Sequence, residues 1–336
     1  GIITLLFILI TSYVNYVNKH FPEQIYITEQ SDTSINLSLP VTGSVHNTQN
    51  GTNNSLANAD FSREVTFITG SPGSYHIDLH LFLFLKTVNV NVVDEKYVYP
   101  CGFQAGLYLK SSGILVVKTD SIESKSSGTI TPCENIITKG DYILKINDEE
   151  INSKKQLSCK VNECAGEKLN IELLRNDEII NVTVTPVEDK NSEYKLGLWV
   201  KDDAQGIGTI TYIDTDYNYA ALGHPITDTT GKALNIKYGR LYSTRILSII
   251  KGQNGTPGEL QGIIDYKNST PIGTIDKNSS YGIYGTIDNS IVKKHSLSLM
   301  SVGYRYSVHK GKAYVRFYRN NKYDDYEIKI TQLNNN

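Results

Sequence analysis

One histidine of this chain, His224, stands in a context suited to proton transfer. It follows the short run Tyr219 to Leu222 and lies between Gly223 and Pro225, which restrict the backbone on both sides. An imidazole held at the end of a strand can accept and return a proton near neutral pH. On spacing alone a structural or surface histidine is the other interpretation, because one histidine is a weak signal.

The residues before His224 predict two strands joined by a turn. Gly206 and Gly208 open this stretch, and alternating Thr, Ile and Tyr residues follow, as in a strand with one buried face. Asp and Asn residues at 214–218 have the side chains typical of a hairpin turn. The second strand would then end at the histidine.

The remainder of the chain beyond residue 200 predicts short strands with Gly, Pro and Asn turns and no strong helical periodicity. This pattern indicates a β-barrel or a β-sandwich.

The composition excludes several classes of function. With 336 residues the chain is long enough for about two domains. Its 33 basic and 35 acidic residues give a net charge of −2, so no basic face for nucleic acid is expected. No phosphate-binding loop or dinucleotide fingerprint is present, and the sequence predicts no cofactor.

The cysteines do not predict a metal site. Cys101, Cys133, Cys159 and Cys164 form no C-x-x-C pair and have no histidine at ligand spacing, so zinc is not expected. One or two disulfides would be permitted outside the cytoplasm, and four reduced cysteines are the alternative.

The amino-terminal third predicts a membrane segment and a tether. Residues 1–20 begin with ten densely apolar positions, which favours a single membrane anchor over a cleaved signal segment. An anchor there would place the folded part on the non-cytoplasmic side. Residues 21–87 are expected to form a flexible linker with lead-in strands, because 29–60 are rich in Asn, Ser, Thr and Gly.

Residues 88–200 resemble a PDZ domain. The run KGDYILKINDEEI has the Gly-Asp turn, strand and Asn-containing turn of that fold, a short helix is expected over 153–164, and two strands over 168–175 and 178–186. The segment YPCGFQAGLYL resembles the carboxylate-binding loop that would receive a peptide end. The positions concerned are Gly102, Phe103, Gly106 and Leu107. A small mixed domain that binds nothing is the alternative, because fold does not fix function.

The stretch from Gly206 to Asp228, together with KGQNGTPGEL, PIGTIDKNSSYGIYG and the PDZ-like segment ahead of them, closely resembles the SpoIVB peptidase family of spore-forming bacteria. The order of segments is similar too: a membrane segment, a linker, a PDZ domain and then a peptidase domain. The resemblance implies a mainly β protein whose residues 201–336 form part of a chymotrypsin-like double β-barrel, incomplete at its carboxyl end.

The resemblance also implies a function. Members are serine endopeptidases of sporulation signalling, found at the forespore membrane or in the space between the two forespore membranes. They cut a regulatory subunit that restrains an intramembrane metalloprotease, whose release activates the late mother-cell sigma factor. The PDZ domain is expected to bind peptide carboxyl termini. His224 corresponds to the general base, which would take the proton of the attacking serine hydroxyl.

The sequence departs from the family at the nucleophile. The family's serine lies in a Gly-Met-Ser-Gly-Ser-Pro-like block with an acidic partner ahead of it, and no such block occurs here. Five serines of this chain lack the glycine context of that block, namely Ser243, Ser248, Ser279, Ser280 and Ser301. We therefore expect a fragment cut at both ends that does not itself hydrolyse peptides. The alternative function is a membrane-tethered PDZ scaffold without catalysis.

Overall fold

The computed structural model describes residues 1–20, 23–29, 32–35, 41–47, 54–63, 65–68, 73–80, 84–264, 266, 270–304, 308–319 and 322–333. The chain divides into two compact units. The first comprises Gly1–Val98, Leu299–Val315 and Asp325–Asn336, and the second comprises Tyr99–Ser298 and Arg316–Asp324.

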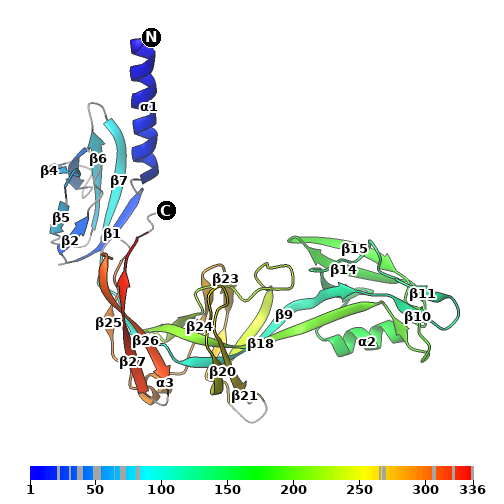
Figure 1. Cartoon of the computed structure of the whole chain (residues 1–336). Coiled ribbons are helices and arrows are strands. Elements are labelled where there is room, and N and C mark those ends of the chain that lie inside the picture. Colours follow the sequence, from blue (N-terminus) through cyan, green and yellow to red (C-terminus); the bar gives the residue numbers. More distant parts are fainter. Residues whose placement is uncertain are drawn as a thin grey trace. The chain divides into compact units, whose positions relative to one another are not determined.

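The first unit contains the long amino-terminal helix α1 (Ile2–His20) and a five-stranded sheet (Figure 1). The order in this sheet is β1 (Gln24–Thr28), β7 (Phe84–Val93), β6 (Gly73–His80), β3 (Thr42–Asn47) and β4 (Asn54–Asp60). Further strands assigned to this unit, wholly or in part, are β2 (Asp32–Ile35), β5 (Val65–Ile68), β8 (Tyr97–Pro100), β25 (Met300–Ser301), β26 (Gly311–Arg319) and β27 (Lys322–Ile330).

The predicted flexible linker over 21–87 is wrong where the structure describes it, because most of the described residues of this segment pair into the sheet. The reason is a period-two pattern beneath the polar composition. Ile25 and Ile27 are buried on β1, Ile77 and Leu79 on β6, and Val88 with alternate residues on β7. The residues between them, Tyr26, Asp78, Asn89 and Asn91, alternate with this buried set, so one apolar face is enough to form a core.

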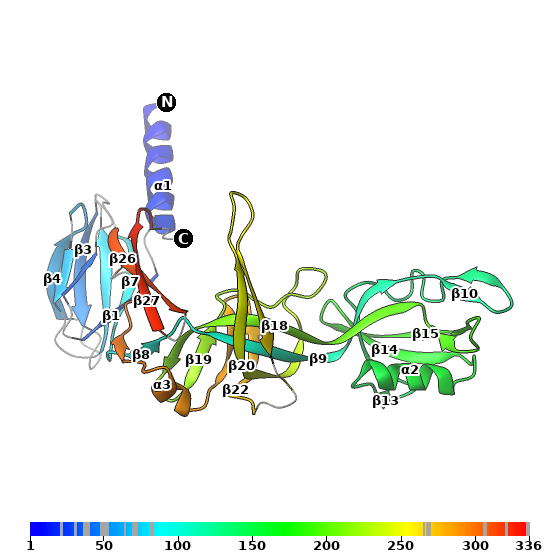
Figure 2. The same ribbon diagram turned by 60° about the horizontal axis from the view of Figure 1, so that its bottom comes forward.

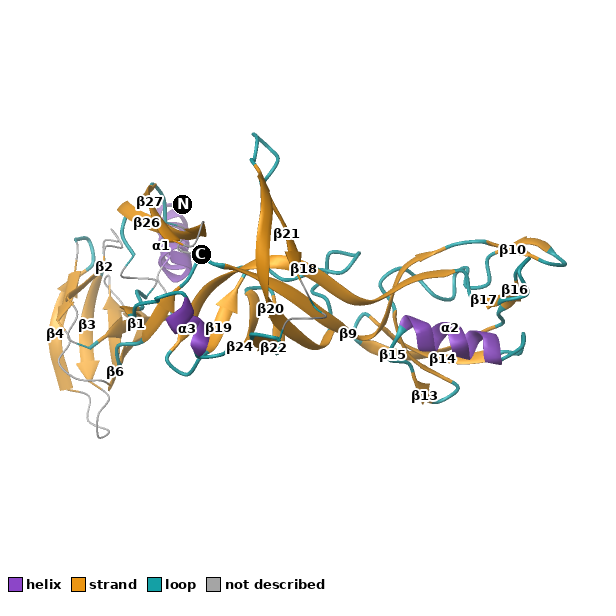
Figure 3. Ribbon diagram, turned by 90° about the horizontal axis from the view of Figure 1, so that it is seen from below, coloured by secondary structure: helices purple, strands orange, loops and turns teal. Residues whose placement is uncertain are grey.

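Two long antiparallel strands, β9 (Gln104–Thr119) and β18 (Leu198–Asp214), form the centre of the second unit (Figure 2). The remaining strands and a short helix lie around the amino-terminal half of β9 and the carboxyl-terminal half of β18. They are β19 (Asn218–Ala221), β20 (Ile236–Ile250), β21 (Glu259–Ile264), β22 (Gly273–Ile275), β23 (Lys277–Ser279), β24 (Gly282–Thr286) and helix α3 (Ser290–Lys294). Strands β20 and β21 continue beyond the sheet as a hairpin (Figure 3). These sheets form half of a barrel around one buried cluster, the barrel-side core.

The other halves of β9 and β18 belong to a smaller assembly with its own buried cluster, spanning Ile114 to Val200. We call residues 114–200 the PDZ-like region. Its elements are β10 (Ile122–Ser124), β11 (Gly128–Ile130), β12 (Tyr142–Ile146), β13 (Glu149–Glu150), α2 (Lys154–Glu163), β14 (Leu169–Arg175), β15 (Glu178–Val184), β16 (Val187–Glu188) and β17 (Tyr194–Lys195).

The predicted elements of the PDZ-like region are confirmed. Helix α2 begins after Ser153, whose hydroxyl accepts a hydrogen bond from the backbone N–H of Gln156 at 3.1 Å. Strands β14 and β15 pair over their full length around the Asn176–Asp177 turn. The mainly β fold with one apolar amino-terminal helix is also confirmed. However, the predicted boundary between residues 200 and 201 falls inside β18, which runs unbroken through both parts.

Candidate active site and peptide groove

The hairpin that carries His224 is fixed at its turn by Asp214. One carboxylate oxygen of Asp214 accepts hydrogen bonds from the backbone N–H groups of Asp216 at 2.9 Å and Asn218 at 2.8 Å. The other oxygen accepts from the Asn218 side chain at 2.9 Å. This Asx-type turn returns the chain so that β19 pairs with the end of β18, as the sequence predicted.

The chain turns sharply immediately before His224. Leu222 and Gly223 both have left-handed backbone conformations, with φ of 73° and 76°. A left-handed leucine is strained, and such strain concentrates at functional sites. The Leu222 side chain lies where a Cβ on Gly208 would be only 2.6 Å from Leu222 Cδ2. A side chain at position 208 would therefore require Leu222 to move.

A second glycine supports the same turn from a neighbouring strand. Gly282, at the start of β24, has φ of 131°. A Cβ there would lie 2.4 Å from the carbonyl oxygen of Ala221 and 3.1 Å from the nitrogen of Gly223. Only glycine permits this approach of backbone to backbone without a shift.

The loop after His224 is held by Asn278. Its side-chain oxygen accepts a hydrogen bond from the N–H of Ile226 at 2.9 Å. Its NH₂ group donates to the carbonyls of Ile226 at 2.8 Å and Leu234 at 3.0 Å. All three bonds join backbone groups at the base of the loop that begins with the histidine, so Asn278 fixes where this loop leaves the sheet.

The imidazole of His224 is exposed and lines a cavity of about 500 Å³. Its Nδ1 lies 2.9 Å from the carbonyl oxygen of Pro225. A carbonyl can only accept, so in the neutral ring Nδ1 carries the proton and Nε2 is the basic nitrogen. Gln205, Gly206 and Ile207 of β18 line the same cavity. The arrangement is therefore that of a candidate general base beside an open strand edge.

The four residues predicted to receive a peptide end do not form an open groove. Gly102 contacts the backbone of Arg316, and the other three, Phe103, Gly106 and Leu107, belong to the barrel-side core or the strands around it. Over 105–109, β9 pairs with β18 on one side and with β20 on the other. Because both edges are occupied, no peptide can add to this strand. The prediction of a carboxylate-binding loop at these positions is wrong.

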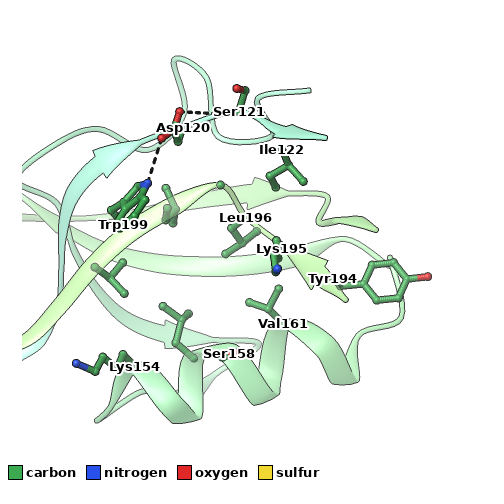
Figure 4. A pocket seen from close by; sticks show the side chains of 14 residues that line it. Asp120, Ser121, Ile122, Lys154, Ser158, Val161, Tyr194, Lys195, Leu196 and Trp199 are labelled. Carbon is green, nitrogen blue, oxygen red and sulfur yellow. Dashed lines mark hydrogen bonds between the residues drawn. The ribbon is translucent and has the colours of Figure 1, made fainter. Parts of the chain in front are cut away.

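A groove does lie in the PDZ-like region, between α2 and the start of β18 (Figure 4). Its volume is about 350 Å³. One wall is formed by Lys154, Leu157, Ser158 and Val161 of α2, and the other by the segment 196–200. Gly197 has φ of 68°, and a Cβ there would lie 2.3 Å from the carbonyl oxygen of Asp120.

The entrance of this groove carries the single tryptophan of the chain. Trp199 is 63% exposed, and its indole N–H donates to the Asp120 carboxylate at 3.1 Å (Figure 4). A hydrogen bond from Lys118, together with that from Trp199, holds the pKa of Asp120 below its usual range. In the sequence, residues 195–200 predict only a strand that joins the PDZ-like segment to the peptidase segment. The Leu-Gly-Leu pattern at 196–198, next to a strand, was the signal that could have identified the groove.

Side chains of the PDZ-like region contact the loop that begins with His224. Lys232 Nζ donates to the Asn176 side chain at 3.0 Å, and the Asn235 N–H donates to the hydroxyl of Tyr142 at 3.3 Å. Burial raises the pKa of Tyr142, and the charge of Asp228 adds to this effect. The candidate base and the candidate binding groove are thus parts of one packed unit.

The cysteines and acidic groups do not form a metal site in the described part of the chain, where no cluster of three or more His, Cys, Asp or Glu side chains could hold an ion. All four cysteines are free. Burial raises the pKa of both Cys101 and Cys133 to about 12, which makes them inert thiols.

Comparisons with known proteins agree with part of this description. A search of curated proteins found no match. Among solved structures, the PDZ domain of the SdrC-like protein from Listeria monocytogenes is similar to 27% of this chain over 90% of its own length, with 17% identity and a TM-score of 0.23. A TM-score this low does not establish a shared fold. Residues 192–336 match the model of the family described as SpoIVB peptidase S55, which confirms the family resemblance inferred from the sequence.

Proposed function

We propose that this chain is the substrate-binding and proton-transfer part of a SpoIVB-type serine endopeptidase in which His224 is the general base. The observation that carries the proposal is the imidazole itself. It is exposed at the end of β19, its Nδ1 faces a carbonyl acceptor, and it lies within the segment that matches the peptidase family. In this role Nε2 would take the proton of a serine hydroxyl and return it to the leaving amine.

In the proposed function the groove between α2 and residues 196–200 binds peptide carboxyl termini. Two features support this use. The edge of β18 that faces α2 has no strand partner in the described structure, and apolar side chains line the groove. Substrates would be proteins outside the cytoplasm, with the regulatory subunit of an intramembrane metalloprotease as the sporulation target.

Helix α1 supports the proposed membrane location. Its first 18 residues after Gly1 are apolar enough to cross a bilayer, with a mean hydropathy of 1.4, although a signal sequence has the same property. We propose that it anchors the protein to the forespore membrane, with the folded units facing the space between the two forespore membranes.

The test is proteolysis of the regulatory subunit by the protein that the intact gene encodes. His224→Ala should lower kcat for cleavage of the regulatory subunit by about 10⁴-fold, because proton transfer to and from the serine is lost. His309→Ala, which removes another exposed histidine, should leave cleavage unchanged. Equal activity of His224→Ala and the parent protein would overturn the assignment of His224.

A membrane-tethered binding scaffold is the second candidate, and the groove favours it because the groove does not include His224. This function predicts that full-length protein binds carboxyl-terminal peptides but cleaves none of them. Absence of cleavage together with specific binding would select the scaffold over the peptidase.

A further inference from the structure

One edge of β18 is open for most of the strand. From Leu198 to Thr209 this strand pairs with β9 on one side. On its other side β19 pairs only from Ile210 onward, and the Leu222 N–H donates to the carbonyl of Thr209 at 3.1 Å. No other described strand pairs with the edge from Leu198 to Gly208. Backbone groups along such an edge can pair with an added strand.

Three cavities follow this open edge in the order of its residues. The groove at α2 is lined by β18 up to Val200. The next cavity, of about 390 Å³, is lined by Lys201, 203–205 and, across it, Lys154. The third is the His224 cavity, lined by 204–207. Lys154 lines both the first and second cavities, and Ala204, Gln205 and Thr227 line both the second and third.

The direction of an occupant follows from β19. This strand runs antiparallel to β18 and stops at the left-handed turn of Leu222 and Gly223, which we call the elbow, where the open edge begins. A peptide that continues the same antiparallel pairing would enter beside His224 and proceed toward Leu198. Its carboxyl end would then lie in the groove at α2, which is where the proposed function places a carboxyl terminus.

We propose that the three cavities form a single track for the carboxyl-terminal segment of a protein substrate, bound as an extended strand on β18. This inference rests on the proposed binding of carboxyl termini in the α2 groove. Positions Leu198 and Gly208 are ten residues apart (208 − 198) on β18. Since paired strands advance together at about 3.3 Å per residue, the peptide backbone beside His224 lies about ten residues before the substrate's carboxyl end.

The substrate class is therefore defined by the length of the substrate's carboxyl-terminal tail. A protein qualifies if it ends in a free, extended tail of at least about ten residues, because a shorter tail cannot occupy the groove and the His224 cavity together. Internal segments of folded proteins do not qualify.

A paramagnetic label tests the track without any requirement for catalysis. Peptides of about sixteen residues are longer than the track and can span it. Each peptide carries one nitroxide label, placed either ten or three residues before its free carboxyl end. Bound to the full chain, the first label should broaden the ring resonances of His224, and the second should broaden Trp199 instead. Peptide binding with no effect of the first label on His224 would overturn the track.

Two control peptides separate the track from the binding site that it assumes. An amidated carboxyl end should weaken binding of both labelled peptides at least about tenfold, since the charge-assisted hydrogen bonds of the carboxylate are lost. If amidation has no effect, the proposed carboxyl-terminal site fails. A peptide that binds through its carboxyl end but leaves the His224 cavity free would overturn the track and leave the carboxyl-terminal site intact.

Backbone methylation identifies the strand pairing. In an added strand only alternate N–H groups point toward β18. N-methylation at successive positions four to seven from the carboxyl end should therefore weaken binding at every second position only. Uniform effects at all four positions would contradict an extended strand on this edge.

Discussion

At the scale of single residues, the site depends on groups that shape the backbone around His224 and not on the imidazole alone. The strained Leu222, the small Gly208 and the side chain of Asn278 all act on the two turns next to it. None of them carries out chemistry. They determine where the Nε2 atom of His224 is placed, which the proposed proton transfer requires.

Substitution of Gly282 tests the backbone contact at the elbow. Gly282→Ala should lower the free energy of unfolding by roughly 1–3 kcal/mol, because its left-handed φ and the nearby Ala221 carbonyl both oppose a Cβ. Urea unfolding measures the change. Gly206→Ala is the matched control, since a Cβ there meets nothing within 4 Å. Equal effects of the two substitutions would contradict this account.

Removal of the Asn278 side chain tests the anchoring of the histidine loop. Asn278→Ala deletes three hydrogen bonds, and we expect a loss of about 2–3 kcal/mol in the free energy of unfolding. The ring resonances of His224 should also shift or broaden at a temperature where the variant is folded. Asn254→Ala, at an exposed position, should change neither measurement. An unchanged His224 spectrum would limit Asn278 to a stabilising role.

At the scale of elements, the paired strands β9 and β18 depend on a buried ion pair. Lys110 Nζ of β9 lies 2.7 Å from the Asp202 carboxylate of β18, and the Lys154 N–H donates to the same carboxylate at 3.2 Å. Asp202 is only 6% exposed. Burial by itself would raise the pKa of Asp202, but the bonds from Lys110 and Lys154 outweigh it and the pKa is lowered.

This lowered pKa predicts an acid-sensitive second unit. The unfolded chain binds a proton on Asp202 at about pH 4, whereas the folded chain does so only at lower pH, so this stabilising contribution is present above pH 4 and is lost on acidification. Asp202→Asn should cost about 3 kcal/mol at pH 7, because Lys110 loses its partner. It should also flatten the decline in stability below pH 4, in contrast to Asp216→Asn in the exposed turn. Parallel pH profiles for parent and Asp202→Asn would refute this account.

At the scale of the whole molecule, the two ends of helix α1 contribute differently, one to the proposed membrane attachment and the other to the core of the first unit. Its beginning is exposed and apolar, while Val17 near its end is fully buried in the core of the first unit. The first contribution suits a bilayer, and the second is part of the fold.

Truncation separates these two contributions. A chain that begins at Tyr13 should remain in the supernatant after ultracentrifugation of cell membranes, whereas the full chain should sediment with them. Because Val17 is retained, the thermal midpoint of the first unit should stay within a few degrees of the detergent-solubilised parent. Recovery of the truncated chain in the membrane fraction would show that α1 is not the anchor.

The sequence predicted the elements of the chain better than their partners. Ser153, the Asn176–Asp177 turn and the Asp214 turn were predictable because each depends on residues within four positions. His224 was predicted as the general base from its local context and the family resemblance, and this role stays a prediction. The groove at α2 was missed because its walls are some forty positions apart in the chain, as Leu157 and Leu196 illustrate. The amino-terminal sheet was missed because polar composition concealed a period-two pattern.

The uninterrupted course of β9 and β18 has a consequence for anyone who wishes to transplant the groove. No peptide linker separates the PDZ-like region from the half-barrel, since both strands pass directly from one core into the other. Excision where the strands pass from one core into the other would cut the hydrogen-bonded ladder between β9 and β18 and leave two unpaired strand ends. A chimera with new peptide preferences must therefore exchange residues within the groove, or import a foreign insert that preserves the spacing and register of both strands.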